Sequence, residues 1–269
     1  MTGPDGSPVS RRRVLLRRGG LVAFGVGLGV AGFAEAADVT DRKLPLRGGA
    51  AGAARPGRPD LLGSGRLELT WFVPTERRLV ALTFDDGPAP QWTPMVLDTL
   101  HRYGVPATFF MVGERARRHA GLVRGRMDRH EIGSHTWAHR DLGRADIEEA
   151  HDDLTRTHRA LAETTGQEPR LLRPPYGHLG GAALAAAVGL RYQVVLWSQQ
   201  MRESDFPGDP AGHARAVVGA VRPGTILLAH DVGADRRLVA LRGLPALIEQ
   251  LRTRGYEFVT VSQLLAERR

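Results

Sequence analysis

Short apolar runs alternate along most of the chain with longer stretches in which apolar residues recur every three or four positions. The short runs are almost continuously apolar, which is typical of strands buried on both faces of a sheet. The longer stretches are clearest at 146–164 and 237–254, where the spacing predicts amphipathic helices. Seven runs are predicted as strands, at 79–84, 107–112, 131–134, 171–173, 192–197, 225–230 and 257–261.

Strands and helices in alternation predict an α/β fold with a parallel sheet covered by helices. Because about seven such units follow one another, we expect a (β/α) barrel, or a distorted relative of one, rather than an open sheet. The 269 residues, 42% hydrophobic and 25% charged, are enough to bury a core without cross-links. They include no cysteine, which excludes disulfides, thiolate metal ligands and cysteine nucleophiles among them.

The first 36 residues resemble an export signal of the twin-arginine type. An arginine-containing pattern at 10–16 precedes a Gly-rich apolar run at 19–33 and a small-x-small cleavage candidate at 34–36. The apolar run is shorter than the ~20 residues of a membrane-spanning helix, so we expect no stable membrane insertion after cleavage. The expected location is outside the cell or in the cell wall, with a membrane-anchored form as the alternative.

The remainder divides into a linker and a folded domain. Residues 37–65 are rich in Gly, Ala, Pro and Arg without periodicity, which predicts a flexible linker. The strand and helix pattern begins near residue 66 and continues to 269, so we expect one large domain over 66–269.

The formal net charge is +8, and Lys43 is the only lysine beside many arginines. A positive charge suits an anionic partner such as nucleic acid, a membrane surface or an acidic cell-wall polymer. GC-rich coding, which favours Arg over Lys, accounts for it almost as well. Residues 1–36 carry five arginines and two acidic residues, so the net charge without them is +5. Because no basic stripe is interleaved with aromatic residues, we expect no nucleic-acid partner.

Polar residues with acid, base or metal-binding chemistry follow several predicted strands. In α/β barrels, residues at the carboxyl ends of several strands together form the active site. Any one of them alone is an ordinary loop residue, and their common position favours a shared site. The residues concerned are Asp85, Asp86, His135, Arg173, His230 and Asp231.

The pair Asp85-Asp86 enters a Gly-Pro turn directly after a buried strand. Its alternative explanation is a turn with helix-capping carboxylates. Two adjacent carboxylates repel each other, however, and a bound cation removes that repulsion. One carboxylate could then bind a metal while the other serves as a general base.

His135 and His139 lie four residues apart, close enough on a helical turn or tight loop to bind one ion. Two unrelated surface histidines are the alternative. With one aspartate they form a set of two nitrogens and one oxygen, which leaves a coordination position open for water or substrate. The chain has no second acidic cluster of the kind that a two-metal phosphoesterase needs.

Four segments in order resemble the signature motifs of the polysaccharide deacetylases of carbohydrate esterase family four. They are TFDDGP at 83–88, HTWAH at 135–139, RPPY at 173–176 and ILLAHD at 226–231. The resemblance covers roughly 79–232 and makes 66–269 the catalytic domain. It implies a distorted (β/α) barrel and an enzyme that removes N-acetyl groups from an N-acetylglucosamine-containing polysaccharide such as peptidoglycan or chitin oligomers.

The resemblance also implies a role for each matching residue. It implies one divalent metal, zinc by preference, with cobalt or nickel as alternatives. The implied metal ligands are Asp86, His135 and His139. The implied catalytic residues are Asp85 as base, Arg173 as its orienting partner, His230 as acid, and Tyr176, whose backbone N–H helps to hold the oxyanion. The expected substrate-binding residues are Leu228 at the acetyl methyl, Pro175 and His178.

One family motif does not match. In the family, an aspartate after Trp197 would support the catalytic histidine or arginine, but Gln200 stands where an acid is often found. Asp205 could be a shifted replacement. A weakened carbohydrate-binding relative therefore remains open. A metal-dependent amidohydrolase acting on a small non-sugar amide also remains open, because the same centre would serve any amide that fits. The sequence makes no prediction of the oligomeric state.

Overall fold

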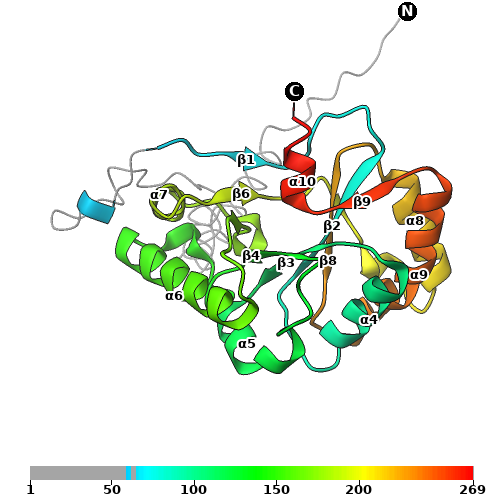
Figure 1. The fold of residues 1–269 in the computed structure, drawn as a ribbon, viewed down its shortest axis with the longest axis horizontal. Helices are drawn as coiled ribbons and strands as arrows, with labels where there is room; N and C mark the ends of the chain where they lie inside the picture. Colours follow the sequence, from blue (N-terminus) through cyan, green and yellow to red (C-terminus); the bar gives the residue numbers. More distant parts are fainter. Residues whose placement is uncertain (1–58, 62–64, 269) are drawn as a thin grey trace, which may run out of the picture. The chain divides into compact units, whose positions relative to one another are not determined.

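The computed structural model describes residues 59–61 and 65–268. These residues form a single parallel sheet with helices packed against it (Figure 1). Within these residues it has nine strands in the order β1-β6-β5-β4-β3-β2-β8-β7, and β9 pairs with β2. The strands are β1 (Leu69–Thr70), β2 (Leu79–Asp85), β3 (Thr108–Met111), β4 (Glu131–Ser134), β5 (Leu171–Leu172), β6 (Gln193–Val195), β7 (Gln199–Gln200), β8 (Thr225–His230) and β9 (Glu257–Val259).

The α/β class and all seven predicted strands are confirmed, with ends shifted by up to two residues. The count of about seven was low because β1 and β7 have two residues each. A run of two residues shows neither alternation nor an apolar stretch, so the sequence pattern cannot reveal it.

The sheet curls into a distorted barrel because the chain passes from one edge to the other within three residues. Leu196, just after β6, donates its N–H to Thr70 in β1. Ser198, two residues later, donates its N–H to Ile226 in β8, and β7 then pairs with β8. Two residues span about 7 Å at most, so the β6 and β8 sides of the sheet must lie close together.

Helices cover the outside of the sheet. In Figure 1, α6 and α7 lie over the part formed by β4 to β6, and α4, α8 and α9 lie over β2, β3 and β8. The predicted helices 146–164 and 237–254 are α6 and α9. The helices are α4 (Thr93–Tyr103), α5 (Gly113–Arg118), α6 (Ile147–Thr165), α7 (Gly181–Gly189), α8 (Pro210–Ala220), α9 (Leu238–Thr253) and α10 (Val261–Leu265). The short 3₁₀ turns are η1 (Pro59–Leu61), η2 (Ala120–Leu122), η3 (Leu142–Arg144), η4 (Pro175–Gly177), η5 (Glu203–Asp205) and η6 (Asp235–Arg237).

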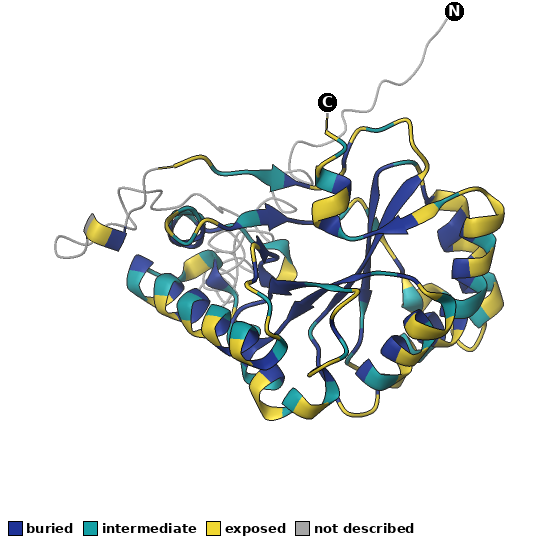
Figure 2. Cartoon of the chain, in the orientation of Figure 1, coloured by how far each residue is buried: buried dark blue, intermediate teal, exposed yellow. Residues whose placement is uncertain are grey.

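The central strand β2 is buried along its whole length, as Figure 2 shows for the middle of the sheet. Val80, Leu82 and Phe84 point outward into the core beneath the helices, while Leu79 and Ala81 belong to a separate cluster inside the barrel. Because side chains alternate along a strand, Thr83 and Asp85 share this inner face. The alternation therefore places a carboxylate at the inner end of the barrel.

The predicted export signal, 1–36, lies outside the described residues. Of the predicted linker, the structure describes 59–61 and Gly65, and Leu61 packs in the core cluster of α6 and α7. None of the helices within 59–61 and 65–268 has the length and apolar character needed to cross a membrane.

Candidate active site

Strand register brings the predicted residues to one edge of the sheet. Asp85 lies opposite Phe110 of β3 and His230 of β8, and Met111 lies opposite Ser134 of β4. His135, the first residue after β4, therefore lies level with the ends of β2 and β8. Arg173 follows β5 at the same edge of the sheet. Leu228 and His230 share the inner face of β8 with Ile226, by the alternation of side chains.

Asp86, His135 and His139 form the group of residues that could hold a metal ion. One ligand atom from each lies within 4.8 Å of the others, the one such group of three found among the described residues. Asp86 Oδ1 lies 3.4 Å from His135 Nε2 and 3.0 Å from His139 Nε2. Asp86 and His139 both have positive φ, 78° and 56°. Such backbone is uncommon outside glycine and is concentrated at functional sites.

The chemistry of these donors fits a divalent transition metal. His135 is buried, and its Nδ1–H donates to the backbone carbonyl of Arg173 at 2.6 Å. This bond directs Nε2 toward Asp86, which is how proteins orient a metal-binding imidazole. Burial lowers the pKa of His135, but Asp85 and Asp86 raise it above its usual value. A proton and a metal therefore compete for the same nitrogen.

Asp86 itself is ready to bind a cation. Burial alone would raise the pKa of its carboxyl, but hydrogen bonds from His135 and His139 hold that pKa well below its usual range. The side chain is therefore ionised at any physiological pH, as a metal ligand must be.

Arg173 holds Asp85 in place. It is fully buried, and its Nη1 donates to Asp85 Oδ1 and to Thr83 Oγ1, both at 2.7 Å. Its Nε and Nη2 donate to the carbonyls of Val195 and Leu196, and its guanidinium lies 4.0 Å from the ring centre of Phe110. Because Oδ1 is engaged, Asp85 Oδ2 is the oxygen left to face the histidines, 3.9 Å from His135 Nε2.

His230 faces a carboxylate that the sequence did not identify. Its Nδ1 lies 3.8 Å from Glu203 Oε1, an ion-pair separation rather than a hydrogen bond, and both atoms are buried. Burial alone would raise the pKa of Glu203, but the adjacent His230 and the charge of Arg237 lower it below its usual value. Glu203 is therefore a negative charge beside the imidazole.

Neither residue considered for this position from the sequence lies there. Gln200 is exposed on β7, and Asp205 forms an ion pair with Arg202. Glu203 belongs to the same segment after Trp197. With four acidic or amide side chains within seven residues, Gln199, Gln200, Glu203 and Asp205, only the path of the backbone determines which one faces His230. His213 in α8 is also buried, and its Nε2–H donates to the carbonyl of Met201 at 2.7 Å.

The rings of Tyr176 and His178 lie next to each other, and the Tyr176 ring contacts His139 of the metal-ligand group. The Tyr176 ring lies edge-on to His139 at 4.9 Å and 5.5 Å from the His178 ring. Tyr176 has φ 61° and is 63% exposed. His178 Nδ1–H donates to Asp141 Oδ2 at 2.8 Å, a partner that the sequence did not identify. Pro175, in the same η4 turn as Tyr176, is buried.

Asp231 supports the turn that carries Asp86. It is buried and accepts a hydrogen bond from Thr93 Oγ1 at 2.5 Å. A side chain on Gly87 would collide with the Asp231 carboxylate, so the turn needs glycine at this position. Burial raises the pKa of Asp231 to about 6, and the nearby charge of Asp86 contributes.

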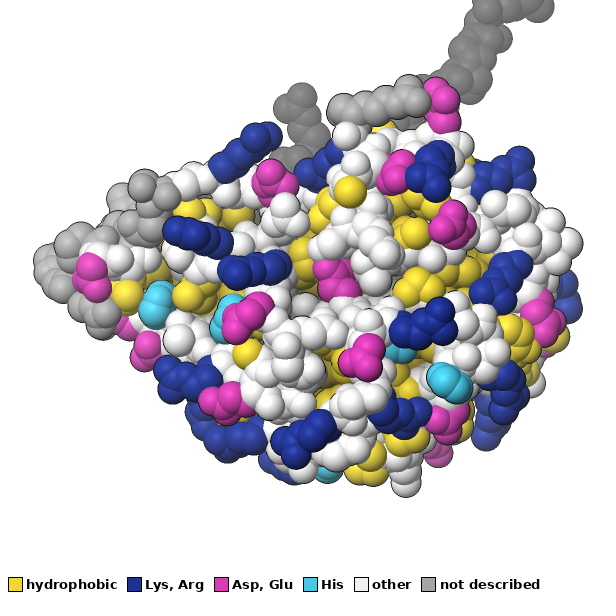
Figure 3. Space-filling model, viewed as in Figure 1, with side chains coloured by type: hydrophobic (Ala, Val, Ile, Leu, Met, Phe, Trp, Pro, Cys, Tyr) yellow, Lys and Arg dark blue, Asp and Glu magenta, His cyan; other side chains and the backbone are white. Residues whose placement is uncertain are grey.

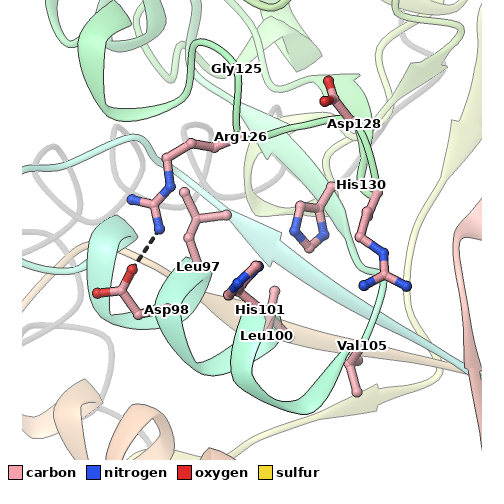
Figure 4. A pocket seen from close by; sticks show the side chains of 10 residues that line it. Leu97, Asp98, Leu100, His101, Val105, Gly125, Arg126, Asp128 and His130 are labelled. Carbon is pink, nitrogen blue, oxygen red and sulfur yellow. Dashed lines mark hydrogen bonds and ion pairs between the residues drawn. The ribbon is translucent and has the colours of Figure 1, made fainter.

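A cavity elsewhere in the described part of the chain lacks this chemistry. It has a volume of about 400 Å³ and lies between α4 and residues 125–130 (Figure 4). Asp98 and Arg126 neutralise each other there at 2.6 Å. Burial, with Arg129 and Arg126 nearby, lowers the pKa of His130 to about 4, so its ring is neutral at physiological pH. The face of the molecule in Figure 3 carries arginines scattered among acidic side chains, so its positive charge is not gathered in one stripe.

Known proteins resemble this chain over most of the described residues. Residues 72–195 match the family model described as polysaccharide deacetylase. A peptidoglycan-N-acetylglucosamine deacetylase of Bacillus cereus is 40% identical over 200 residues, which cover 73% of this chain and 92% of that protein. A chitooligosaccharide deacetylase of Bradyrhizobium sp. is 37% identical, over 70% of this chain and 90% of its own length. A solved structure of a peptidoglycan N-acetylglucosamine deacetylase has TM-score 0.68 and 31% identity, over 73% of this chain and 92% of that one.

Proposed function

This chain belongs to the polysaccharide deacetylase family, and we propose that it hydrolyses the N-acetyl groups of an N-acetylglucosamine-containing polysaccharide, releasing acetate. The observation that carries the proposal is the position of Asp85. Its Oδ1 is held by the buried Arg173, while its Oδ2 faces the Asp86, His135 and His139 group. A fixed carboxylate beside a metal-ligand set is an arrangement that metal-dependent amide hydrolysis by water uses.

Two different residues, Asp85 and His230, carry out the two proton transfers. A divalent metal held by Asp86, His135 and His139 supplies a Lewis acid for the amide carbonyl when it is bound. Asp85 takes a proton from the attacking water through Oδ2, since Arg173 occupies Oδ1. His230, opposite Asp85 on β8, gives a proton to the leaving amine, and Glu203 Oε1 lies 3.8 Å from its Nδ1.

The oxyanion that forms on the acetyl carbonyl needs a hydrogen-bond donor. We assign this role to the backbone N–H of Tyr176, by its match to the family motif. The inner-face position of Leu228 supports its assignment to the acetyl methyl, because a small apolar group needs an apolar wall.

Zinc is the metal we propose, with cobalt and nickel as alternatives. Two imidazole nitrogens and one carboxylate oxygen are a common zinc ligand set, and cobalt and nickel accept the same donors. Removal of the metal with a chelator should abolish acetate release, and each metal should be added back separately to rank them.

The substrate we propose is a polymer rather than a small amide. The Bacillus relative is named for peptidoglycan and the Bradyrhizobium relative for chitooligosaccharides. The exposed ring of Tyr176 beside His139 offers a surface on which a sugar could stack, and a small amide would not need it. Retention of Asp85, Asp86, His135, His139, Arg173 and His230 argues against a weakened binding protein.

The direct test is acetate release by the metal-loaded protein from chitin oligomers, peptidoglycan and acetylated xylan. The Asp85→Asn variant should bind metal as the wild type does and release no acetate. Activity only on small amides would favour the amidohydrolase alternative. Binding to oligosaccharides without acetate release would favour the binding-protein alternative.

We propose export by the twin-arginine route for the precursor, supported by the sequence pattern of residues 1–36. Sequencing the amino terminus of the secreted protein tests this, and a start just after Ala36 is expected. Recovery of the uncut chain in the membrane fraction would instead favour the anchored form.

A further inference from the structure

We propose that Arg237 is a positioning residue for the metal ligand Asp86, an inference that rests on the metal site of the proposed function. Arg237 Nη1 donates to Asp86 Oδ2 at 3.1 Å and to the backbone carbonyl of Val232 at 2.9 Å. The sequence motifs do not include Arg237, which lies 151 positions from Asp86 along the chain.

The two oxygens of Asp86 have different partners. Oδ1 faces His135 Nε2 and His139 Nε2, whereas Oδ2 is held by Arg237. The carboxylate is therefore held from both sides and cannot rotate without breaking a charge-assisted hydrogen bond. This leaves Oδ1 as the oxygen directed at the metal-ligand group.

Arg237 also explains how two adjacent carboxylates coexist after β2. Asp85 pairs with Arg173 at 2.7 Å, and Asp86 pairs with Arg237 at 3.1 Å. Each member of the acidic pair thus has its own guanidinium, which offsets part of the repulsion between them. Arg115 adds a hydrogen bond to the backbone carbonyl of Asp86 at 3.0 Å and so supports its positive φ.

The loop after β8 fixes Arg237 in this position. The backbone N–H of Arg237 donates to the carbonyl of Ala234 at 2.8 Å and so forms the η6 turn. Gly233 has φ 131°, and a side chain there would press against the Arg237 side chain. The guanidinium crosses the open space above this glycine, and its side chain is 25% exposed. The hydrogen bonds to Asp86 Oδ2 and to the carbonyl of Val232 hold it there.

The test measures metal affinity, independently of activity. Zinc and cobalt are titrated into the metal-free full chain by calorimetry, for wild type, Arg237→Ala, Arg237→Gln and Arg237→Lys. The matched control is Arg236→Ala, the exposed neighbour in the same turn. Loss of a partner that orients a metal ligand weakens binding roughly 10- to 100-fold, and this is expected for Arg237→Ala. Gln retains a hydrogen-bond donor without the charge, so its loss should be smaller.

A second readout is the visible spectrum of bound cobalt. In Arg237→Ala, Asp86 Oδ2 is released and can approach the ion, so the cobalt absorption should weaken as the coordination number rises. Arg236→Ala should leave both the affinity and the spectrum unchanged. If Arg237→Ala fails to fold, as judged by circular dichroism, the Gln and Lys variants carry the same test.

Unchanged or tighter metal binding in folded Arg237 variants overturns the proposal, because the charge of Arg237 would then only repel the ion. A wild type that binds no metal overturns it as well. A wild type that binds metal tightly but releases no acetate refutes the proposed function, while an affinity loss in Arg237→Ala would still support the positioning role.

Discussion

Replacing Glu203 by Gln removes the negative charge beside His230 and keeps the size of the side chain. Glu203 Oε1 lies 3.8 Å from His230 Nδ1. At this separation, two unit charges interact by about 4 kcal/mol at an effective dielectric constant of about 20. The His230 and Glu203 side chains are 21% and 13% exposed, so water screens part of this interaction. We take about 1.5 to 3 kcal/mol as the share of this pair energy that Glu203→Gln removes.

This share corresponds to a fall of roughly 10- to 100-fold in kcat, since about 1.4 kcal/mol is a factor of ten. The loss stays within the ~10²- to 10⁴-fold that a positioned general acid contributes. KM should change little, because Glu203 acts through His230 and not on the substrate.

The assay is acetate release from chitin oligomers by the zinc-loaded protein, measured from mildly acidic to mildly alkaline pH. Asp205→Asn is the matched control, because Asp205 lies in the same η5 turn but pairs with Arg202. Equal kcat for wild type and Glu203→Gln would refute the role of Glu203. The same loss in Asp205→Asn would show that the turn matters, and not the charge that faces His230.

Three further variants test other parts of the structure. Arg173→Met leaves the buried Asp85 charge without its partner and should lower the free energy of unfolding by about 3 to 5 kcal/mol in urea titrations. A loss below about 1 kcal/mol would contradict the stabilising role of the buried ion pair. Asp231 has a folded pKa of about 6 against 3.8 unfolded, so its contribution to the stability of the metal-free protein falls as pH rises from about 4 to 6. Asp231→Asn should therefore gain up to about 3 kcal/mol relative to wild type between pH 4 and 7, and parallel pH profiles would rule this out. His178→Ala should raise KM for chitin oligomers about 2- to 10-fold at unchanged kcat and leave KM for the monosaccharide unaffected. An equal fall of kcat for substrates of every chain length would instead mean that the substitution disturbs the metal ligands.

Much of the fold could be predicted because burial leaves a direct mark on the sequence. β2, β3 and β8 are buried on both faces, so their residues form continuous apolar runs. The short β1 and β7 were missed because their position depends on how the sheet curls, and not on any local pattern. The same curl brings the residues after β6 next to β8.

The site could be predicted where its residues occur in local groups or directly follow predicted strands. His135 and His139 are four apart, and Asp85 and Asp86 are adjacent, so their spacing together with their position after strands favours a shared site. Arg237 lies far from these groups along the chain and has no neighbour in sequence that marks it. Among the acidic and amide residues after Trp197, the sequence had no means of choosing Glu203.

The sequence by itself determined the seven longer strands, the residues that could hold a metal ion and the edge of the sheet at which they meet. Apolar runs and short-range spacing are local properties, and parallel strands carry their carboxyl ends to one side. Only the tertiary structure decided which charges complete the site: Glu203 beside His230, and Arg237 on the second oxygen of Asp86. These contacts depend on strand register and on the path of the loops after β6 and β8. A charged loop residue has no periodicity that shows which way its side chain points.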